Sequence, residues 1–272
     1  MPKLHPVAGL VFTVLASSLL PAAEPILIQP TKAEKVTEVR VVPLASGSTL
    51  KVKNVNGYIH VVAWDREQVE FTGAFKPSSR DEQVKVRIAT TSKGLEIIGE
   101  YPKHEHHFGS YRGPECQMDL KVPHKLLPSL ETVNGDVKLS GTAGEAQINT
   151  VNGGVFGKDL EGGLRAQSVN GAIQLEQVKG GLKLETVNGS VQGKGLDGQG
   201  QGVAISAVNG TITLDTTGLK GHLHASTVNG GLSFKAQGAQ DVEVKKQTVR
   251  ATFPGSDQKI QLSTVNGSIT VE

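Results

Sequence analysis

The stretch L-K-L-E-T-V-N-G-S-V, residues 182–191, decides the fold of this chain of 272 residues. Apolar and polar side chains alternate in its first half, with Leu182 and Leu184 in one phase. Such alternation predicts a β-strand with one buried face. Asn188 and Gly189 then favour a turn, because both residue types tolerate backbone with positive φ. We therefore expect a strand, a turn and a second strand that begins near residue 191.

The same pattern recurs along the chain. The triplet Val-Asn-Gly places its asparagine at Asn56, Asn134, Asn152, Asn170, Asn188, Asn209, Asn229 and Asn266. From 134 to 229 the copies follow one another at steps of 18 to 21 residues. The longer last step contains T-V-R-A-T-F at 248–253, which we interpret as a degenerate copy. A fixed period of roughly 20 residues indicates the stacked units of a solenoid.

The phase of the apolar residues changes within each copy. Thr186 keeps the phase of Leu184, whereas Val187 and Val191 have the opposite phase. In a straight strand one of these two sets would point to solvent. We therefore expect a bend at the Thr-Val junction, which would let both sets face one interior.

Glycine pairs at 162–163 and 180–181 predict a second corner in each unit. An apolar residue, Leu160 or Val178, comes shortly before each pair and indicates a third short side. The composition agrees with a narrow interior that small aliphatic side chains fill. Gly accounts for 33 residues, and aromatic residues make up 4% of the chain against 37% hydrophobic residues.

These features together predict an all-β fold, a parallel β-solenoid (β-helix-like) of ~20-residue T-V-N-G coils. Stacked strands lie about 4.8 Å apart, so equivalent residues of successive coils would form columns. The asparagines would then form a ladder joined by side-chain amides, as in other in-register arrays. An antiparallel meander that uses Asn-Gly in its hairpin turns is the alternative fold.

The start of the chain is typical of a secretory signal. Lys3 precedes an uncharged run at 7–20, and the small residues of Pro21-Ala22-Ala23 follow it. We assign 1–23 to a signal peptide, with an N-terminal membrane anchor as the alternative, and 24–34 to a linker. The mature chain is then expected to be extracytoplasmic (periplasm, cell surface or secreted) and to contain no membrane span.

Residues 35–130 are strand-like but do not repeat cleanly, and they hold most of the aromatic residues, including Trp64. Within them, the segment at 54–61 matches the T-V-N-G template. We interpret 35–130 as an N-terminal β-cap with a first repeat-like strand pair, because the end of a repeat array needs an atypical cover. Residues 131–272 are the predicted solenoid repeats.

The run L-E-T-V-N-G-D-V at 130–137, the recurring T-V-N-G and the opening V-K-N-V-N-G at 52–57 resemble one bacterial family. It is a β-strand-repeat family of unknown function whose members are described as "putative adhesins". The resemblance extends from about Val36 to Glu272. It implies a bacterial envelope or secreted β-repeat protein and no established activity.

We expect no catalytic, cofactor-binding or metal-binding residues. The run His104, Glu105, His106 and His107, with Cys116 downstream, has metal-ligand chemistry, but its spacing matches no defined site. We interpret the run as a solvated loop, with a physiological metal as the alternative. Cys116 is equally interpreted as a small buried residue of the strand at 117–122, and pairing between two chains in an oxidising compartment is the remaining alternative.

A carbohydrate-active enzyme, lyase or glycosidase, on a β-helix is the first alternative function, and it needs paired carboxylates in a groove. The aspartates of the repeats fall at different template positions: Asp136, Asp159, Asp197, Asp215, Asp241 and Asp257. Catalytic motifs such as H-E-x-x-H and G-x-S-x-G do not occur. A net charge of +2 gives little support to nucleic-acid binding.

Residues 265–272 fit the template, and no polar cap follows them. We therefore expect an open edge there that pairs with a second copy or with a partner strand, and the alternative is that the charged Glu272 is enough to prevent such pairing. The sequence favours a non-enzymatic, adhesin-like binding protein or envelope scaffold, with a glycan or an envelope protein as its partner. An envelope stress or signalling component that acts through partner contacts is the second alternative.

Overall fold

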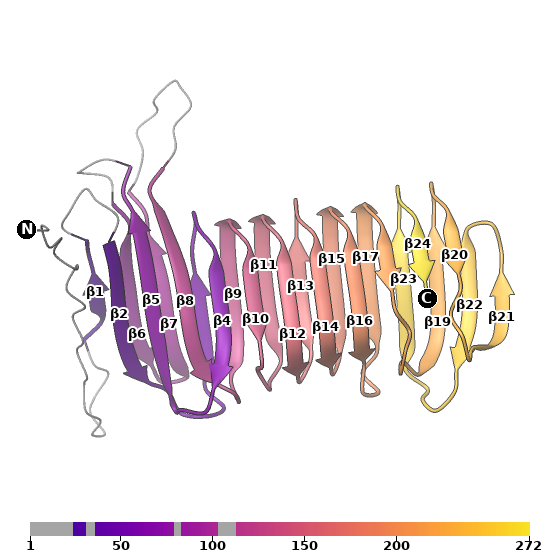
Figure 1. The fold of residues 1–272 in the computed structure, drawn as a ribbon, viewed down its shortest axis with the longest axis horizontal. Helices are drawn as coiled ribbons and strands as arrows, with labels where there is room; N and C mark the ends of the chain where they lie inside the picture. Colours follow the sequence, from indigo (N-terminus) through magenta and orange to yellow (C-terminus); the bar gives the residue numbers. More distant parts are fainter. Residues whose placement is uncertain (1–23, 31–35, 79–82, 103–112) are drawn as a thin grey trace, which may run out of the picture.

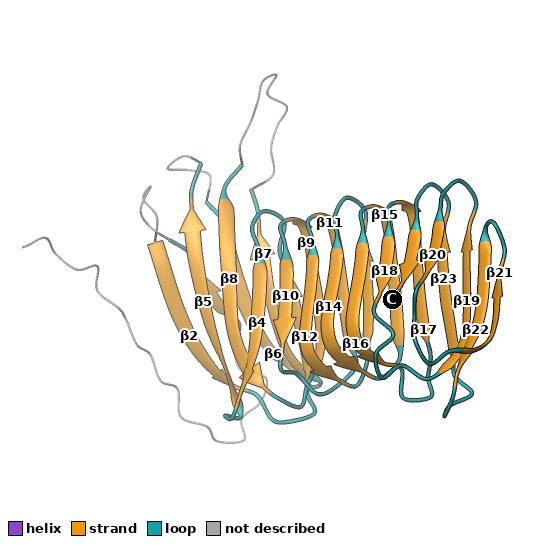
Figure 2. Ribbon diagram, turned by 45° about the vertical axis from the view of Figure 1, so that its right-hand side comes forward, coloured by secondary structure: helices purple, strands orange, loops and turns teal. Residues whose placement is uncertain are grey.

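The computed structural model describes residues 24–30, 36–78, 83–102 and 113–272. In this part of the chain every regular element is a strand, and the strands form a 13-stranded sheet and an 11-stranded sheet. Both sheets run along an elongated molecule, with their strands across its long axis (Figures 1 and 2). The predicted all-β fold with long parallel sheets is confirmed, and it is β-solenoid-like. The predicted signal peptide at 1–23 lies outside the described residues.

We call the 13-stranded sheet sheet A and the 11-stranded sheet sheet B. The spatial order of sheet A is β1 (Ile26–Ile28), β6 (Lys85–Thr91), β7 (Gly94–Glu100), β3 (Thr49–Lys53), β9 (Leu127–Asn134), β11 (Ala146–Asn152), β13 (Leu164–Ser168), β15 (Leu182–Asn188), β17 (Val203–Asn209), β23 (Lys259–Thr264), β19 (Gly221–Thr227), β22 (Thr248–Phe253) and β21 (Gln240–Val244). The spatial order of sheet B is β2 (Val36–Pro43), β5 (Gln68–Lys76), β8 (Glu115–Pro123), β4 (Ile59–Trp64), β10 (Val137–Ser140), β12 (Val155–Glu161), β14 (Ile173–Lys179), β16 (Val191–Asp197), β18 (Ile212–Leu214), β24 (Ile269–Val271) and β20 (Leu232–Phe234).

In the centre of the molecule each repeat gives one strand to each sheet. Strands β9, β11, β13, β15 and β17 pair in parallel, and so do their partners β10, β12, β14, β16 and β18. Val155 pairs with Ile173, and Ile173 with Val191, so equivalent side chains form buried columns. The core therefore lies between the two sheets, and it is filled mainly by Val, Ile, Leu and Ala.

Two polar columns hold the coils in register at the turn between the sheets. One is a ladder of asparagine side chains, in which each Nδ2 donates to the Oδ1 of the asparagine before it in the stack at 2.7–3.0 Å, starting from the acceptor Asn56. The ladder continues through Asn134, Asn152, Asn170, Asn188, Asn209 and Asn266 to Asn229. In the other, a buried hydroxyl donates to the glycine carbonyl of the neighbouring coil, as Thr150 does to Gly135 at 3.2 Å and Thr186 to Gly171 at 3.1 Å. Polar groups of each coil thus form hydrogen bonds with those of the neighbouring coil.

The prediction of a bend at the Thr-Val junction is wrong. Strand β15 continues through Val187 to Asn188, so the side chains keep alternating and Val187 points outward, 40% exposed. Thr186 is buried at 4% exposure, and the phase changes only across the turn before Val191. The valine of each triplet therefore forms an exposed column, because the backbone stays extended until the asparagine.

The third short side exists. Leu160 and Val178 are buried and pair with each other beyond a bend in their strands. The bend places Asp159 and Gln177 in the left-handed region, with φ of 51° and 55°. Residues other than glycine rarely adopt this conformation, so the packing of Leu160 and Val178 below the bend stabilises it.

The N-terminal strands combine antiparallel and parallel pairing. Strand β5 pairs antiparallel with β2 and β8, and β6 with β7, whereas β3 and β4 join the parallel stack through β9 and β10. The stretch 24–34, expected as a linker, contains β1, which pairs antiparallel with β6. Its apolar I-L-I sequence gives it a face to bury, and Ile28 is 2% exposed.

The C-terminal strands are not at an edge, which contradicts the expected edge pairing through 265–272. Strand β23 lies between β17 and β19, and β24 lies between β18 and β20, with parallel pairing on both sides. The mark C accordingly lies inside the stack in Figure 1, and β21 and β22 form its end. Residues 248–253 are not a degenerate copy either. They form β22, which follows β21 in a hairpin and so runs antiparallel to β19, and the segment lacks the Asn-Gly of the repeat.

Candidate functional site

The outer face of sheet B carries a groove with a cavity volume of about 980 Å³. It crosses the strands from β4 to β18. The groove residues are His60, Val61, Val62, Lys138, Leu139, Ser140, Phe156, Gly157, Lys158, Gln174, Leu175, Glu176, Gln192, Gly193, Lys194, Thr213, Asp215 and Glu272. We call this surface the sheet B groove.

Strand register arranges the outward side chains of the groove in two rows. The first row runs His60, Lys138, Phe156, Gln174, Gln192 and Thr213, one residue from each successive strand. The second row includes Ser140, Lys158, Glu176 and Lys194. Neighbouring members are one strand spacing apart, about 4.8 Å. The groove therefore presents a regular array to an extended ligand.

The groove floor is shaped by glycines that alternate with leucines in one inward column. Gly157 pairs with Leu175, and Leu175 pairs with Gly193. A Cβ at Gly157 would lie 2.7 Å from Leu175 Cδ2, and one at Gly193 would lie 2.5 Å from Leu196 Cδ1. Leu175 of the neighbouring coil fills the space at Gly157, and Leu196 of the same strand fills most of the space at Gly193. The strands can therefore pack closely beneath the two rows.

A polar cluster lies at the β4 end of the groove. The rings of Tyr58 and His60 stack with centroids 3.8 Å apart and an interplanar angle of 15°. Tyr58 Oη donates to Asp119 Oδ2 at 2.9 Å, and His60 Nδ1 lies 3.4 Å from Asp119 Oδ1. Burial and the Asp119 carboxylate raise the pKa of Tyr58 to about 12. Burial also lowers the pKa of His60, although Asp119 acts in the opposite direction. The imidazole is therefore held in place and favours its neutral form.

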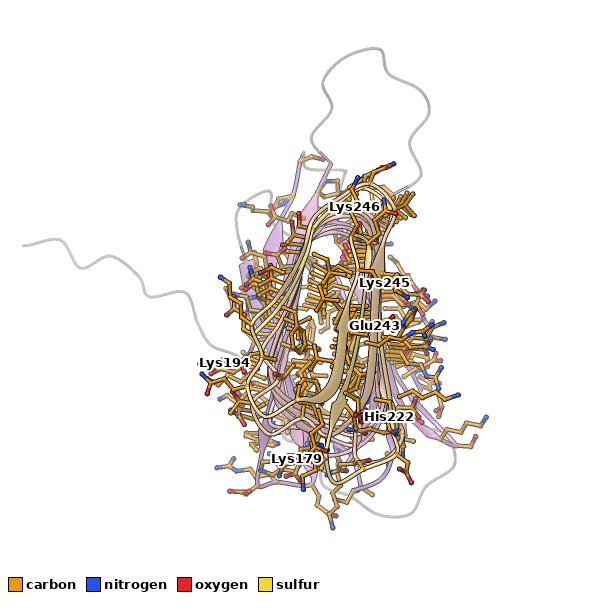
Figure 3. All side chains as sticks on the ribbon, turned by 90° about the vertical axis from the view of Figure 1, so that its right-hand side faces the viewer. Lys179, Lys194, His222, Glu243, Lys245 and Lys246 are labelled. Atoms are coloured by element: carbon orange, nitrogen blue, oxygen red, sulfur yellow. The ribbon has the colours of Figure 1, made fainter. Side chains whose placement is uncertain are left out.

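Charges in the groove are unevenly paired. Lys158 Nζ forms an ion pair with Glu176 Oε2 at 3.2 Å. Lys138 has no carboxylate within 4.0 Å in the part of the chain that the structure describes, and its Nζ lies 5.6 Å from the Phe156 ring centroid. Lys194, at the opposite end, projects from the sheet B side of the stack, away from His222 of sheet A (Figure 3).

Asp215, a carboxylate of the groove, does not have the raised pKa of a glycosidase acid. Such an enzyme needs one carboxylic acid with a raised pKa. The pKa of Asp215 is instead lowered, because the side chain and backbone N–H of Thr217 donate hydrogen bonds to it. Asp215 is thereby held as a carboxylate, which suits binding better than proton donation.

The sequence-predicted site residues do not gather in one place. His104, Glu105, His106 and His107 lie outside the described residues. Cys116 is fully buried in β8, as expected, and burial raises the pKa of its thiol to about 12. Within the described ranges, no group of three or more His, Cys, Asp or Glu residues could hold a metal ion.

Among the aspartates of the repeats, Asp215 lines the sheet B groove. Asp136 lines a second pocket, together with Tyr58 and Asn134. Asp159 belongs to the bend before the third side, and Asp241 to β21 at the end of the stack. Sequence reasoning missed the groove. Its signal was Phe156, an aromatic residue at an outward position of the repeat.

No protein-family model matches the sequence, and the comparison with curated proteins finds no match. Among solved structures, a Bacteroides fragilis protein described as a "putative adhesin" matches with a TM-score of 0.51 and 14% identity, over 88% of this chain and 99% of that chain. A Clostridium sporogenes "putative cell adhesion protein" matches at 0.44 and 11%, with the same two coverages. A Parabacteroides distasonis "putative lipid binding protein" matches at 0.37 and 11%, over 86% and 94%.

At 14% identity, the likeness to the Bacteroides protein is one of fold. The described residues form no helix with the length and hydropathy to cross a bilayer. The resemblance inferred from the T-V-N-G repeat is confirmed, and the chain shares the all-β fold of a Bacteroides protein described as a "putative adhesin".

Proposed function

We propose that the protein is a non-enzymatic, adhesin-like binding protein and that the sheet B groove holds an extended, repetitive partner such as a glycan. The observation that carries this proposal is the array of outward side chains, which repeats at one strand spacing across the groove. A polymer with a regular unit can repeat the same contact along such an array, and repeated weak contacts add to a useful affinity.

A protein strand fits this surface less well than a glycan. Strand addition requires a sheet edge with unpaired backbone groups. The strands under the groove, such as β12 and β14, are paired on both sides. A ligand must therefore bind through side chains, and the groove offers amide, hydroxyl, ammonium and carboxylate groups together with the rings of His60 and Phe156. These are the groups that bind sugar hydroxyls and sugar ring faces.

The proposal includes a domain organisation. Each T-V-N-G segment is the repeating coil, and 35–130 acts as a cap with a first coil at β3 and β4. Support comes from the antiparallel strands that cover this end and from the parallel pairing of β3 and β4 with β9 and β10. A signal peptide at 1–23 would place the mature protein outside the cytoplasm, where envelope glycans and surface polysaccharides are accessible.

Glycan-array binding tests this proposal with two matched double variants. Gln174→Arg with Gln192→Arg places bulky charges in the groove, and Gln147→Arg with Gln261→Arg places them at exposed positions of sheet A. We expect the groove variant to lose glycan binding and the sheet A variant to keep it. Equal binding by both variants, or no glycan binding by the unmodified chain, would refute the proposed function.

A further inference from the structure

The β4 end of the sheet B groove differs from the rest because it combines two rings with a cation between them. His60, Lys138 and Phe156 lie on the adjacent strands β4, β10 and β12 in direct register. Two strand spacings separate the two rings, about 10 Å. This distance is close to the length of two linked hexoses, so both rings could contact one linear sugar chain.

The imidazole of His60 is preorganised. Tyr58 stacks on it, and Asp119 lies against Nδ1 while accepting the Tyr58 hydroxyl. Nε2 has no hydrogen-bond partner among the described residues, so it is the ring nitrogen available to a ligand. A side chain that is already fixed loses little conformational entropy when it binds.

Lys138 supplies a positive charge that has no carboxylate partner among the described residues. Lys158, in the next row, is paired with Glu176, and the field of Lys194 reaches Asp215. Lys138 instead lies over the face of Phe156, and no carboxylate of the described chain is within 4.0 Å of it. A ligand carboxylate at this point would form a charge-assisted hydrogen bond, which is about twice as strong as a neutral one.

We propose that this end of the groove is a subsite for linear polysaccharides that carry carboxylates, such as polyuronates. The Lys138 ammonium pairs with a sugar carboxylate, the face of Phe156 contacts the apolar C–H face of a sugar ring, and His60 Nε2 bonds a hydroxyl. Gln174 and Gln192 continue the contacts along the same row. The inference rests on the proposed function and names its ligand class.

The test measures binding of the full chain to oligogalacturonate and to the same oligomer with its carboxyl groups reduced. Lys138→Gln is compared with Lys246→Gln, which removes an exposed lysine after β21 at the end of the stack (Figure 3). We expect Lys138→Gln to weaken binding of the acidic oligomer roughly tenfold, as for loss of a hydrogen bond to a charged group. Binding of the reduced oligomer should not change, and Lys246→Gln should change neither.

Phe156→Leu gives a second readout, because it removes the ring and keeps an apolar side chain. We expect it to weaken binding of both oligomers. Equal affinity of the unmodified chain for the two oligomers, or unchanged acidic binding in Lys138→Gln, would overturn the subsite. If the Gln174→Arg, Gln192→Arg variant still loses binding of the reduced oligomer, the proposed function survives that result. If neither oligomer depends on the groove, both proposals fail.

Discussion

Residues 127–214 and residues 221–271 carry the same T-V-N-G pattern but are stacked in different orders. In the first region, sequence order and spatial order coincide from β9 to β18. In the second, the coil of β23 and β24 lies before that of β19 and β20. Both regions use the same asparagine and hydroxyl columns, and Asn266 bonds both Asn209 and Asn229. The repeat therefore determines which column a residue joins, and it leaves open the order in which the coils stack.

The difference originates in the segments around the inserted coil. Strands β21 and β22 form an antiparallel hairpin that closes sheet A after β19, so a later coil has no free parallel edge there. Gln258, 5% exposed, bridges the two neighbouring coils: its Oε1 accepts from the Gly200 N–H at 3.0 Å, and its Nε2 donates to the Lys220 carbonyl. Thr216 binds the Glu272 carbonyl through Oγ1 at 2.7 Å. These contacts stabilise the inserted position.

Deletion of 259–272 should have the largest effect. The segment buries Ile260, Leu262, Ile269 and Val271, and each such side chain contributes about 1.5–3 kcal/mol. The loss is comparable to the whole stability of a typical domain. We therefore expect β19 to β22 to lose amide protection in hydrogen exchange and the denaturant midpoint to fall. The control Val265→Ala changes an exposed side chain of the same segment and should leave both unchanged. Full amide protection of β19 in the deletion variant would contradict the position of β23 between β17 and β19.

Substitution of turn glycines compares the two regions directly. A Cβ at Gly189 or at Gly267 would lie 2.0 Å from the carbonyl oxygen of a neighbouring coil. A Cβ at Gly231 meets only Ser268 Oγ, at 3.6 Å. Gly189→Ala and Gly267→Ala should each destabilise the protein by about 2 kcal/mol in urea unfolding, and Gly231→Ala by less than about 0.5 kcal/mol. A Gly267→Ala variant as stable as Gly231→Ala would show that the inserted coil is not tightly stacked.

The hydroxyl column allows a finer comparison. Thr186 donates to the Gly171 carbonyl at 3.1 Å, and Thr264 donates to the Gly210 carbonyl at 3.1 Å. Thr186→Val and Thr264→Val keep the side-chain shape and remove one hydrogen bond, so each should lower the free energy of unfolding by about 1 kcal/mol. Ala207 is the member of this column without a hydroxyl, so Ala207→Ser serves as the reverse test and should stabilise slightly. If the two Val variants differ clearly in their free energy of unfolding, the hydroxyl column does not stabilise the two regions equally.

The antiparallel N-terminal strands should lose stability at alkaline pH, because β8 buries the thiol of Cys116. The pKa of the Cys116 thiol is raised from 9.0 to about 12 by burial. The folded state therefore favours the neutral thiol. Its contribution is complete below pH 9 and is lost as the pH rises towards 12. Cys116→Ala should flatten the decline of stability above pH 9, and a thiol reagent at pH 8 should label only unfolded protein. Rapid labelling of the native protein would contradict the burial of Cys116.

Much of the fold could be predicted from the sequence, because alternation and the T-V-N-G period specify strands, turns and columns. The inserted coil could not, since Asn209 bonds equally well to the asparagine of any copy. The outward valines cannot be recognised from hydropathy alone, because an apolar residue such as Val187 is expected to point inward, whereas the strand continues through it and turns its side chain outward. The groove could not be predicted because it depends on the alignment of outward residues from separate coils. Phe156 was its local sign.

Two engineered disulfide pairs test the inserted coil most directly, because Ala204 is in register with Gln261, which in turn is in register with His224. Neighbouring strands are about 4.8 Å apart and next-nearest strands about 10 Å, whereas a disulfide spans at most about 7 Å between Cα atoms. Ala204→Cys with Gln261→Cys should therefore form a disulfide within one chain, and Ala204→Cys with His224→Cys should not. Disulfide formation by the second pair, with none in the first, would mean that the coils stack in sequence order and that the insertion is wrong.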